Sequence, residues 1–322
     1  MDIIGTILWP IKWVVELILV AWHWLLTAMG MDPAAGITWV LAIVGLTVVV
    51  RAALIPIFVR QIKNQRRMLE IAPQLKKIQD KYKGKKDQFS REAMSRETME
   101  LYKKTGTNPL SSCLPLLLQM PVFFSLFQVL NGAQSGKAGV GPLNSTLAQQ
   151  FGNATLFGVA PLHQSFQGAM NAHPPQVAVM VIAAVMVVLM TGSQFLTQLQ
   201  IVSKNMSPET KASPQFKQQR ILLYLLPFVF LFSGFAFPLG VMFYWLTSNL
   251  WTMGQQFLVI RNMPTPGSDA AKAREARLAR KGKLVQDGAV VLAVEEAPQQ
   301  KITTQRVQPV NKNRAKKQAG KK

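Results

Sequence analysis

Long uncharged apolar stretches alternate with polar, mostly basic segments along this chain. Four such stretches contain one charged residue between them, Arg51; they are residues 36–59, 110–133, 176–199 and 221–259. A helix needs about 20 apolar residues to cross a hydrocarbon core about 30 Å thick. Because backbone polar groups find no water there, a helix must satisfy them internally. The pattern therefore predicts an all-α polytopic membrane protein.

The last of these stretches is long enough for two helices. It is interrupted at residues 237–240 (Phe-Pro-Leu-Gly), where proline and glycine favour a turn. The first arm of this pair has 17 residues and would reach only about 25 Å, so we expect a locally thinned bilayer. The sequence thus predicts five transmembrane helices, at about 37–59, 110–133, 176–199, 221–237 and 241–260.

Basic residues are concentrated in alternate connecting segments. Of the 36 Lys and Arg residues, 33 fall within 60–104, 200–220 and 261–322, whereas segment 134–175 contains only Lys137. Short loops rich in Lys and Arg stay in the cytoplasm. We therefore expect the N-terminus outside, the C-terminus in the cytoplasm, and 134–175 as an external loop.

The N-terminal segment, residues 1–30, is predicted to be an amphipathic helix lying on the outer surface of the membrane. Its tryptophans suit the headgroup level, and its strongly polar side chains share one narrow helical face; these are Lys12, Glu16, His23 and Thr27. A sixth transmembrane helix and a signal peptide are the alternatives. The segment lacks the basic start of a signal peptide and a lipobox cysteine.

Residues 60–104 are predicted to form a cytoplasmic helical hairpin that turns at 83–87. The first arm carries a narrow apolar stripe with alternating spacings of three and four, suited to one partner helix: Met68, Ile71, Leu75, Ile78 and Tyr82. The alternative is a solvated connector that only joins two transmembrane helices. A segment of 45 residues is long for that role.

The C-terminal tail, residues 261–322, is predicted to be basic and largely disordered. It begins with a Pro- and Gly-containing linker at 264–267, continues with a helix-prone basic stretch at 270–283, and ends in a run rich in lysine. Nothing in it could bury a core. Two roles are open at this point: a topology signal that also attracts anionic lipid, and a site for phosphate-rich RNA.

Arg51 is a charged residue within an otherwise uncharged apolar stretch, so its presence needs an explanation. It lies nine residues, or about 13 Å, from Arg60 at the cytoplasmic boundary, which places it near the middle of the bilayer. An arginine there costs about 2.5–3.5 kcal/mol on insertion scales. None of the apolar stretches contains Asp or Glu. Arg51 must therefore face water, backbone carbonyls or an acidic group supplied by another molecule.

Other polar residues within the predicted helices favour a hydrated cavity around Arg51, although each alone could hydrogen-bond a neighbouring helix. Thr47 lies one turn from Arg51 on the same face. The polarity of the remaining candidates predicts a hydrophilic groove that opens to the cytoplasm; they include Gln119, Gln194, Gln198 and Tyr244.

Catalytic and metal-binding patterns are missing from the sequence, so we expect neither an enzyme nor a cofactor. Cys113 is the sole cysteine, and the histidines lack ligand spacing. Two functions of different classes are considered for a membrane protein with this pattern. A secondary transporter would also bury an arginine, but it predicts inverted repeats that the five unequal helices do not show. A ribosome tether would use the basic tail and leave Arg51 without a role.

Three stretches resemble the YidC-type membrane protein insertases. Residues 48–56 (VVVRAALIP) are similar to the family's first core helix with its groove arginine, residues 108–123 to the entry of its second, and residues 237–256 to its fifth. The resemblance covers about residues 9–261. The chain lacks the large external domain of insertases from double-membraned bacteria and the lipobox of many Gram-positive ones. It is therefore similar to a short, actinobacterial form.

The resemblance implies an insertase and chaperone of the bacterial plasma membrane that works without ATP, alone or with the Sec translocon. Its substrates would be nascent membrane proteins. On the matching positions, Arg51 with Thr47 would attract the polar outer segment of a substrate, and Trp245 with Tyr244 would line its path towards lipid. The hairpin 60–104 would recruit substrates, and the tail would contact the ribosome. The core insertase would span residues 31–260.

Overall fold

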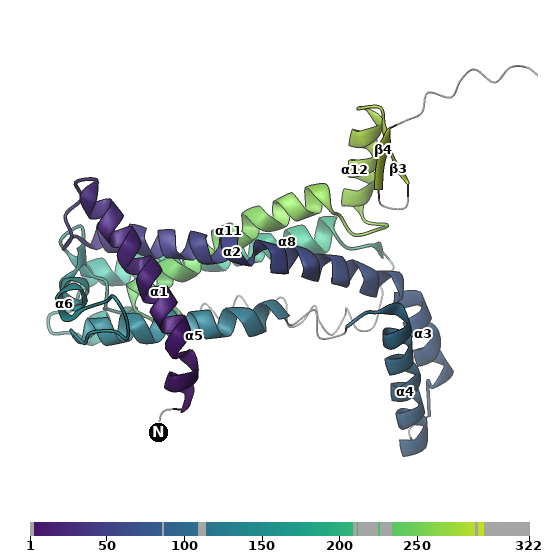
Figure 1. The fold of residues 1–322 in the computed structure, drawn as a ribbon, viewed down its shortest axis with the longest axis horizontal. Coiled ribbons are helices and arrows are strands. Elements are labelled where there is room, and N and C mark those ends of the chain that lie inside the picture. Colours follow the sequence, from purple (N-terminus) through teal and green to yellow (C-terminus); the bar gives the residue numbers. More distant parts are fainter. Residues whose placement is uncertain are drawn as a thin grey trace, which may run out of the picture. The chain divides into compact units, whose positions relative to one another are not determined.

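The computed structural model describes residues 3–85, 87–108, 114–208, 211, 225, 234–286 and 289–292. The chain divides into two units, Met1–Arg274 and Glu275–Lys322. Long helices dominate the first unit (Figure 1). The second contains the end of one helix and a small β-hairpin.

Four long helices correspond to predicted membrane helices: α2 (Gly36–Glu70), α5 (Leu114–Gln134), α8 (Val177–Lys204) and α11 (Leu239–Asn262). Helix α11 packs against both α8 and α2. Helix α2 continues well past the predicted boundary at residue 59, because residues 61–70 are mostly good helix formers without glycine or proline. The predicted helix at 221–237 lies largely outside the described residues.

Within the described residues, three helical segments are long and apolar enough to cross a membrane: Gly5–Ala28, Gly36–Asn64 and Val177–Lys204. The architecture is therefore that of a largely helical membrane protein. The number of five transmembrane helices stays a prediction.

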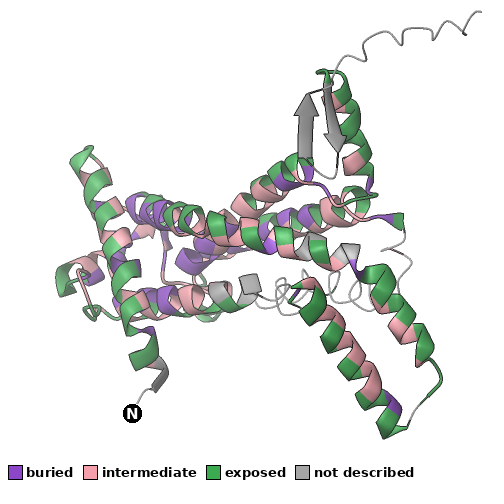
Figure 2. Cartoon of the chain, turned by 45° about the vertical axis from the view of Figure 1, so that its right-hand side comes forward, coloured by how far each residue is buried: buried purple, intermediate pink, exposed green. Residues whose placement is uncertain are grey.

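The core lies where the long helices face one another, and exposed residues follow their outer sides (Figure 2). Trp39, Ile43 and Leu46 of α2 are fully enclosed, together with Leu126 of α5 and Met242 of α11. The outer side of α8 shows the reverse pattern of a soluble helix, with large exposed aliphatic residues; these include Val181, Val185, Val188, Leu189 and Leu196. Such a face suits contact with lipid.

Helix α1 (Ile3–Ala28) crosses over α2 and α5 instead of running parallel to them (Figure 1). Its apolar residues Ile7, Trp9 and Trp24 are exposed, whereas Glu16 and His23 are buried against the protein. The predicted polar face of this helix therefore points towards the protein at these two residues. The position of α1 on the membrane surface stays a prediction, with a transmembrane position as the alternative.

The segment between α5 and α8 is folded. It contains α6 (Ser145–Asn153), the short antiparallel strands β1 (Thr155–Leu156) and β2 (Ala160–Pro161), and α7 (Phe166–Asn171). The backbone N–H groups of Leu239 and Gly240 donate to carbonyls of this segment. It therefore covers the first turn of α11, and its buried side chains extend the core of the bundle.

Helices α3 (Ala72–Lys81) and α4 (Gln88–Thr105) lie side by side as a hairpin (Figure 1). Asp87 caps α4 by accepting a hydrogen bond from the Ser90 N–H at 2.8 Å. Gly106 ends this helix with a positive φ of 63°, a conformation that glycine adopts without strain. The hairpin thus begins later than predicted, because residues 60–70 belong to α2.

The described part of the tail contains a helix, within the stretch predicted to be helix-prone, and two short strands that were not predicted. Helix α12 (Asp269–Ala279) is rich in alanine and arginine, which favour helices, and the Ser268 hydroxyl accepts from the Ala271 N–H at 3.2 Å. Strands β3 (Lys283–Gln286) and β4 (Ala289–Leu292) pair antiparallel and are rich in β-branched residues. Residues 293–322, the rest of the tail, lie outside the described residues.

Candidate functional site

Arg51 lies in the middle of α2, within the helical bundle. Its side chain is half-buried, and its Nε atom is enclosed without a hydrogen-bond partner among the described residues. Within that part of the chain it also forms no ion pair. These observations agree with the sequence argument that an acidic partner for Arg51 is missing from the apolar stretches.

Tyr244 of α11 lies close enough to Arg51 for the two side chains to interact electrostatically. The side-chain nitrogen of Gln119, on α5, donates a hydrogen bond to the Tyr244 hydroxyl. Ser248 follows Tyr244 by one turn on the same helix face. Three helices thus contribute to one polar group, here named the Arg51 cluster: Arg51, Gln119, Tyr244 and Ser248.

Several buried polar atoms of this cluster have no partner among the described residues: Arg51 Nε, Gln119 Oε1 and Ser248 Oγ. The hydroxyl of Ser125, six residues after Gln119 on α5, is also buried without a partner among the described residues. Buried polar groups in proteins are nearly always hydrogen-bonded, and each one left unpaired costs about 1–3 kcal/mol. The arrangement suits water or the polar groups of a bound chain.

Thr47 is fully buried, one turn before Arg51. Its hydroxyl donates to the Ile43 carbonyl at 2.7 Å, as a helical threonine commonly does. The single hydroxyl proton is therefore used inside α2, and only the oxygen lone pairs could serve a substrate. A direct role of Thr47 in a groove stays a prediction.

Trp245 belongs to an aromatic cluster between α5 and α11. Its ring stacks on Phe123 with centroids 5.3 Å apart and meets Phe237 edge-on at 4.6 Å. Phe127 contacts both Phe123 and Phe237. Sequence reasoning selected Trp245 and missed the three phenylalanines, although the spacing of Phe123 and Phe127 places them on one helix face.

Gln194 and Gln198 of α8 are both half-buried. The Oε1 atom of Gln198 is enclosed and has no partner among the described residues. None of the described contacts joins either glutamine to the Arg51 cluster. Helix α11 is linked to α8 instead by a 3.4 Å hydrogen bond from Asn249 Nδ2 to the Met190 carbonyl. The groove-lining role of these two glutamines therefore stays a prediction.

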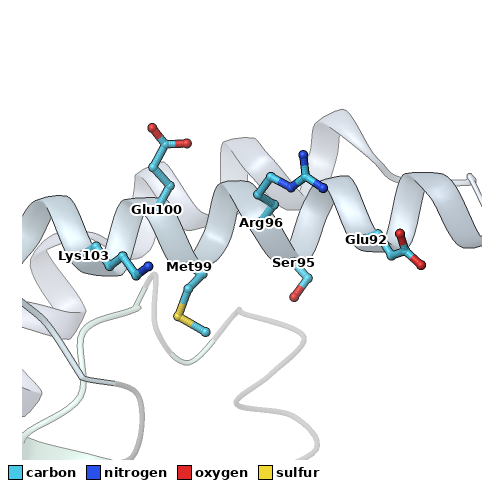
Figure 3. Close-up of a pocket in the computed structure, with 6 residues that line it drawn as sticks. All are labelled: Glu92, Ser95, Arg96, Met99, Glu100 and Lys103. Atoms are coloured by element: carbon cyan, nitrogen blue, oxygen red, sulfur yellow. The ribbon is translucent and has the colours of Figure 1, made fainter.

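A shallow pocket lies along one face of α4, outside the helical bundle (Figure 3). Its lining mixes charged residues with one exposed methionine: Glu92, Ser95, Arg96, Met99, Glu100 and Lys103. No group of His, Cys, Asp and Glu able to hold a metal ion occurs among the described residues.

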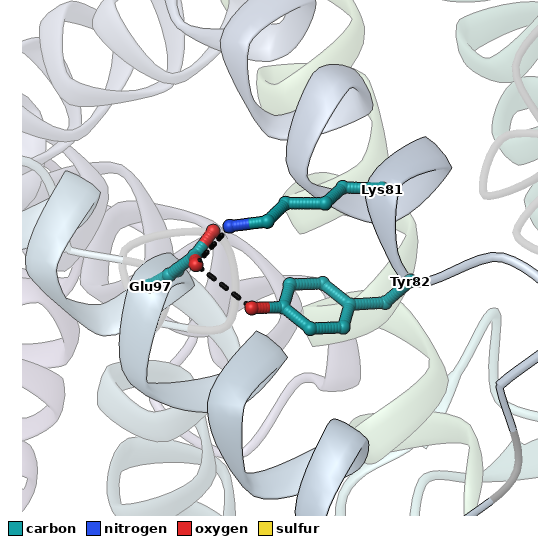
Figure 4. A network of polar contacts seen from close by, with 3 residues as sticks. All are labelled: Lys81, Tyr82 and Glu97. Carbon is teal, nitrogen blue, oxygen red and sulfur yellow. Dashed lines mark hydrogen bonds and ion pairs between the residues drawn. The ribbon is translucent and has the colours of Figure 1, made fainter.

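The α3–α4 hairpin is held together by a polar network (Figure 4). Glu97 accepts hydrogen bonds from Lys81 Nζ at 2.5 Å and from the Tyr82 hydroxyl at 2.7 Å. The bonds from Lys81 and Tyr82 lower the pKa of Glu97, and the same contact raises the pKa of Lys81. Because the Lys81–Glu97 ion pair is largely accessible to solvent, the network fixes the register of the hairpin more than it stabilises the fold.

Crossing helices with a lipid-suited outer surface, and an arginine in α2 whose Nε atom has no partner among the described residues, indicate a multi-pass α-helical membrane protein. Sequence comparison agrees, since the model of the 60Kd inner membrane protein family matches residues 30–266. The chain belongs to this family, that of the YidC-type membrane protein insertases.

Curated relatives match most or nearly all of the chain. The membrane protein insertase YidC of Tropheryma whipplei strain Twist is 46% identical over 98% of this chain and 97% of its own length. The Bifidobacterium longum protein of the same name is 36% identical over 96% and 95%. The Streptomyces avermitilis insertase is 44% identical over 84% of this chain and 61% of its own length.

Proposed function

We propose that this protein inserts nascent membrane proteins into the plasma membrane through a hydrated groove around the Arg51 cluster. The observation that carries the proposal is the set of enclosed, unpartnered polar atoms contributed by α2, α5 and α11. A membrane protein that binds no water or polar ligand here would be more stable with apolar residues in place of these polar groups. Their presence favours a site that water fills at rest and a polar substrate segment fills during insertion.

The energetics of the proposed reaction need no ATP. A polar segment that crosses 30 Å of lipid meets a large desolvation cost, and a water-filled half-channel shortens the dry part of the path. Burying an apolar helix in lipid then releases about 25 cal/mol per Å² of apolar surface. The net reaction is favourable, and the protein lowers only the barrier.

Arg51 would attract the acidic outer segment of a substrate, because it is the one charge in the apolar stretches and its Nε atom has no partner among the described residues. Its planar guanidinium offers several donors to a carboxylate at once. The aromatic cluster around Trp245 would provide an apolar path from the groove towards lipid. Thr47, Gln194 and Gln198 would extend the hydrated lining.

Basic cytoplasmic elements would bring substrates to the groove. The charge pattern supports an outside N-terminus and a cytoplasmic C-terminus, so the α3–α4 hairpin and the tail would face the ribosome and anionic lipids. The hairpin offers exposed apolar side chains, among them Phe89 and Met99, for substrates or for the Sec translocon. A chaperone role would follow from the same groove, if a helix can wait there before release.

Reconstitution tests this proposal directly. Purified protein in liposomes free of nucleotide should insert a small single-span substrate, scored by protection of its outer segment from protease. Protein-free liposomes control for spontaneous insertion. Equal protection in both preparations, with the protein folded and correctly oriented, would refute the proposed activity.

A further inference from the structure

Glu16, in the middle of α1, is buried to 1% exposure although it carries a carboxylate. Its two oxygens accept hydrogen bonds from consecutive backbone N–H groups, Val140 at 2.9 Å and Gly141 at 2.7 Å. These donors belong to the loop that follows α5. Consecutive backbone N–H groups that converge on one anion form a strong site for negative charge.

The receiving loop is shaped around this carboxylate. A Cβ atom added to Gly139 would lie 2.2–2.4 Å from the Glu16 carboxyl atoms, and one on Gly141 would lie 2.7 Å from the Trp13 ring. The loop is closed on itself by a 2.7 Å hydrogen bond from the Gly139 N–H to the Leu143 carbonyl. The absence of a Cβ at both positions therefore leaves the space into which α1 brings Glu16 and Trp13.

Two further contacts fix the other half of α1 on α2. The Trp22 ring lies over Gly45, where an added Cβ would come within 2.4 Å of it. His23 stacks on the buried Trp39 with ring centroids 4.0 Å apart and contacts the Pro33 carbonyl at 2.9 Å. Helix α1 is thus fixed to α2 near its C-terminal end and to the α5 loop near its middle.

We propose that Glu16 is a positioning residue, a latch that holds α1 across α2 and α5. The carboxylate joins α1 to the loop at residues 139–141, while the aromatic contacts join it to α2. Because α2 carries Arg51 and α5 carries Gln119, this brace keeps two helices of the Arg51 cluster at a fixed separation. The consequence for insertion rests on the proposed function; the latch itself does not.

Because Glu16 and Gly139 are in close contact, a double-mutant cycle of Glu16→Ala and Gly139→Ala can test whether this contact holds α1 on the loop. Gly139→Ala should force α1 off the loop in the wild-type background, because its new methyl group overlaps the carboxylate. In a Glu16→Ala background the same methyl group has room, so it should add little. Gly132→Ala is the matched control, since nothing lies within 4 Å of a Cβ at that position of α5.

The position of α1 can be read by pulsed electron spin resonance on the full chain carrying Cys113→Ser. Spin labels at Leu17→Cys and Asn153→Cys, both exposed sites, report the separation of α1 from α6. One narrow distance is expected for the parent and for Gly132→Ala. Glu16→Ala and Gly139→Ala should raise the detached population by about tenfold or more, the factor for one lost charge-assisted hydrogen bond. Glu16→Gln keeps one acceptor oxygen and should fall between.

The double variant decides between the latch and unrelated damage. A detached population no larger than that of Glu16→Ala alone supports the latch, whereas additive effects, or a silent Gly139→Ala, would overturn it. In proteoliposomes, both single variants should lower the insertion rate, and Gly132→Ala should not. Unchanged insertion by detached variants would overturn the positioning role. If the parent protein failed to insert the substrate, that result would instead count against the proposed function. The spin-label distances of the single and double variants would still test the latch.

Discussion

Replacing Tyr244 with phenylalanine removes one hydroxyl from the Arg51 cluster and leaves the aromatic ring in place. The ring's contact with Phe123, at a centroid separation of 6.4 Å, should therefore persist. What is lost is the acceptor for the Gln119 side-chain nitrogen, so that both polar atoms of this amide would lack a partner among the described residues. The reverse change, Gln119→Leu, leaves the Tyr244 hydroxyl without this donor.

The coupling between these two positions follows from the environment of the bond. Side-chain hydrogen bonds between membrane helices contribute about 0.6 kcal/mol on average and about 1.7 kcal/mol at most. We expect the upper part of this range, because both groups are largely enclosed and Arg51 polarises the hydroxyl. Each single variant should thus lose about 1–1.5 kcal/mol, and the double variant little more than either one.

Unfolding by sodium dodecyl sulfate in dodecyl maltoside micelles, followed by circular dichroism, measures these free energies. Strictly additive losses would mean that the Gln119–Tyr244 bond does not stabilise the bundle. If water in the groove replaces the missing partner, both single losses and the coupling should fall towards zero. That result would agree with the hydrated groove and would contradict only the expected size of the Gln119–Tyr244 contribution.

Three further predictions concern other parts of the molecule. The pKa of Glu97 is lowered by its hydrogen bonds from Lys81 and Tyr82, so the hairpin should lose this support as the pH falls below about 4. Amide hydrogen exchange in α3 and α4 should then become faster. Glu97→Gln should remove this dependence of exchange on pH. Gly45→Ala should cost about 1–3 kcal/mol by the same detergent assay, because its Cβ overlaps the Trp22 ring, and Gly192→Ala, with open space around it, should not. In a chain with Cys113→Ser, an impermeant maleimide should label exposed Ser135→Cys in intact cells and exposed Ser95→Cys only after lysis; the opposite result would invert the orientation.

The sequence predicted the elements that depend on local pattern. Uncharged apolar stretches of sufficient length gave the positions of α2, α5, α8 and α11, because a chain cannot place so many apolar residues elsewhere. The isolation of Arg51 was also predictable, since a missing acidic residue is a fact of composition. Its neighbours Gln119 and Tyr244 were candidates by polarity, and the structure brings them together with it.

Features that depend on tertiary packing were not predictable. The polar stripe of α1 correctly placed Glu16 and His23 on one face, but period alone does not tell whether a polar face meets water or buried backbone donors. The Gly139–Gly141 loop has no recognisable motif, and its role appears only when α1 lies on it. In the tail, the helix at Asp269–Ala279 falls in the stretch predicted to be helix-prone, whereas the pairing of Lys283–Gln286 with Ala289–Leu292 was not predicted.

Arg51 is proposed to recruit polar substrate segments electrostatically, and matched substrates test this role most directly. Insertion yield should be measured in proteoliposomes for one single-span substrate whose translocated segment is either acidic or neutral. Arg51→Ala should impair the acidic substrate most, and Arg51→Lys should retain part of the activity because the charge survives without the planar fork of donors. Arg51→Glu should give the lowest insertion yield for the acidic substrate. Its yield should partly recover when the acidic residue of the substrate is changed to lysine. Equal loss for acidic and neutral substrates would contradict electrostatic recruitment and assign Arg51 to hydration of the groove alone.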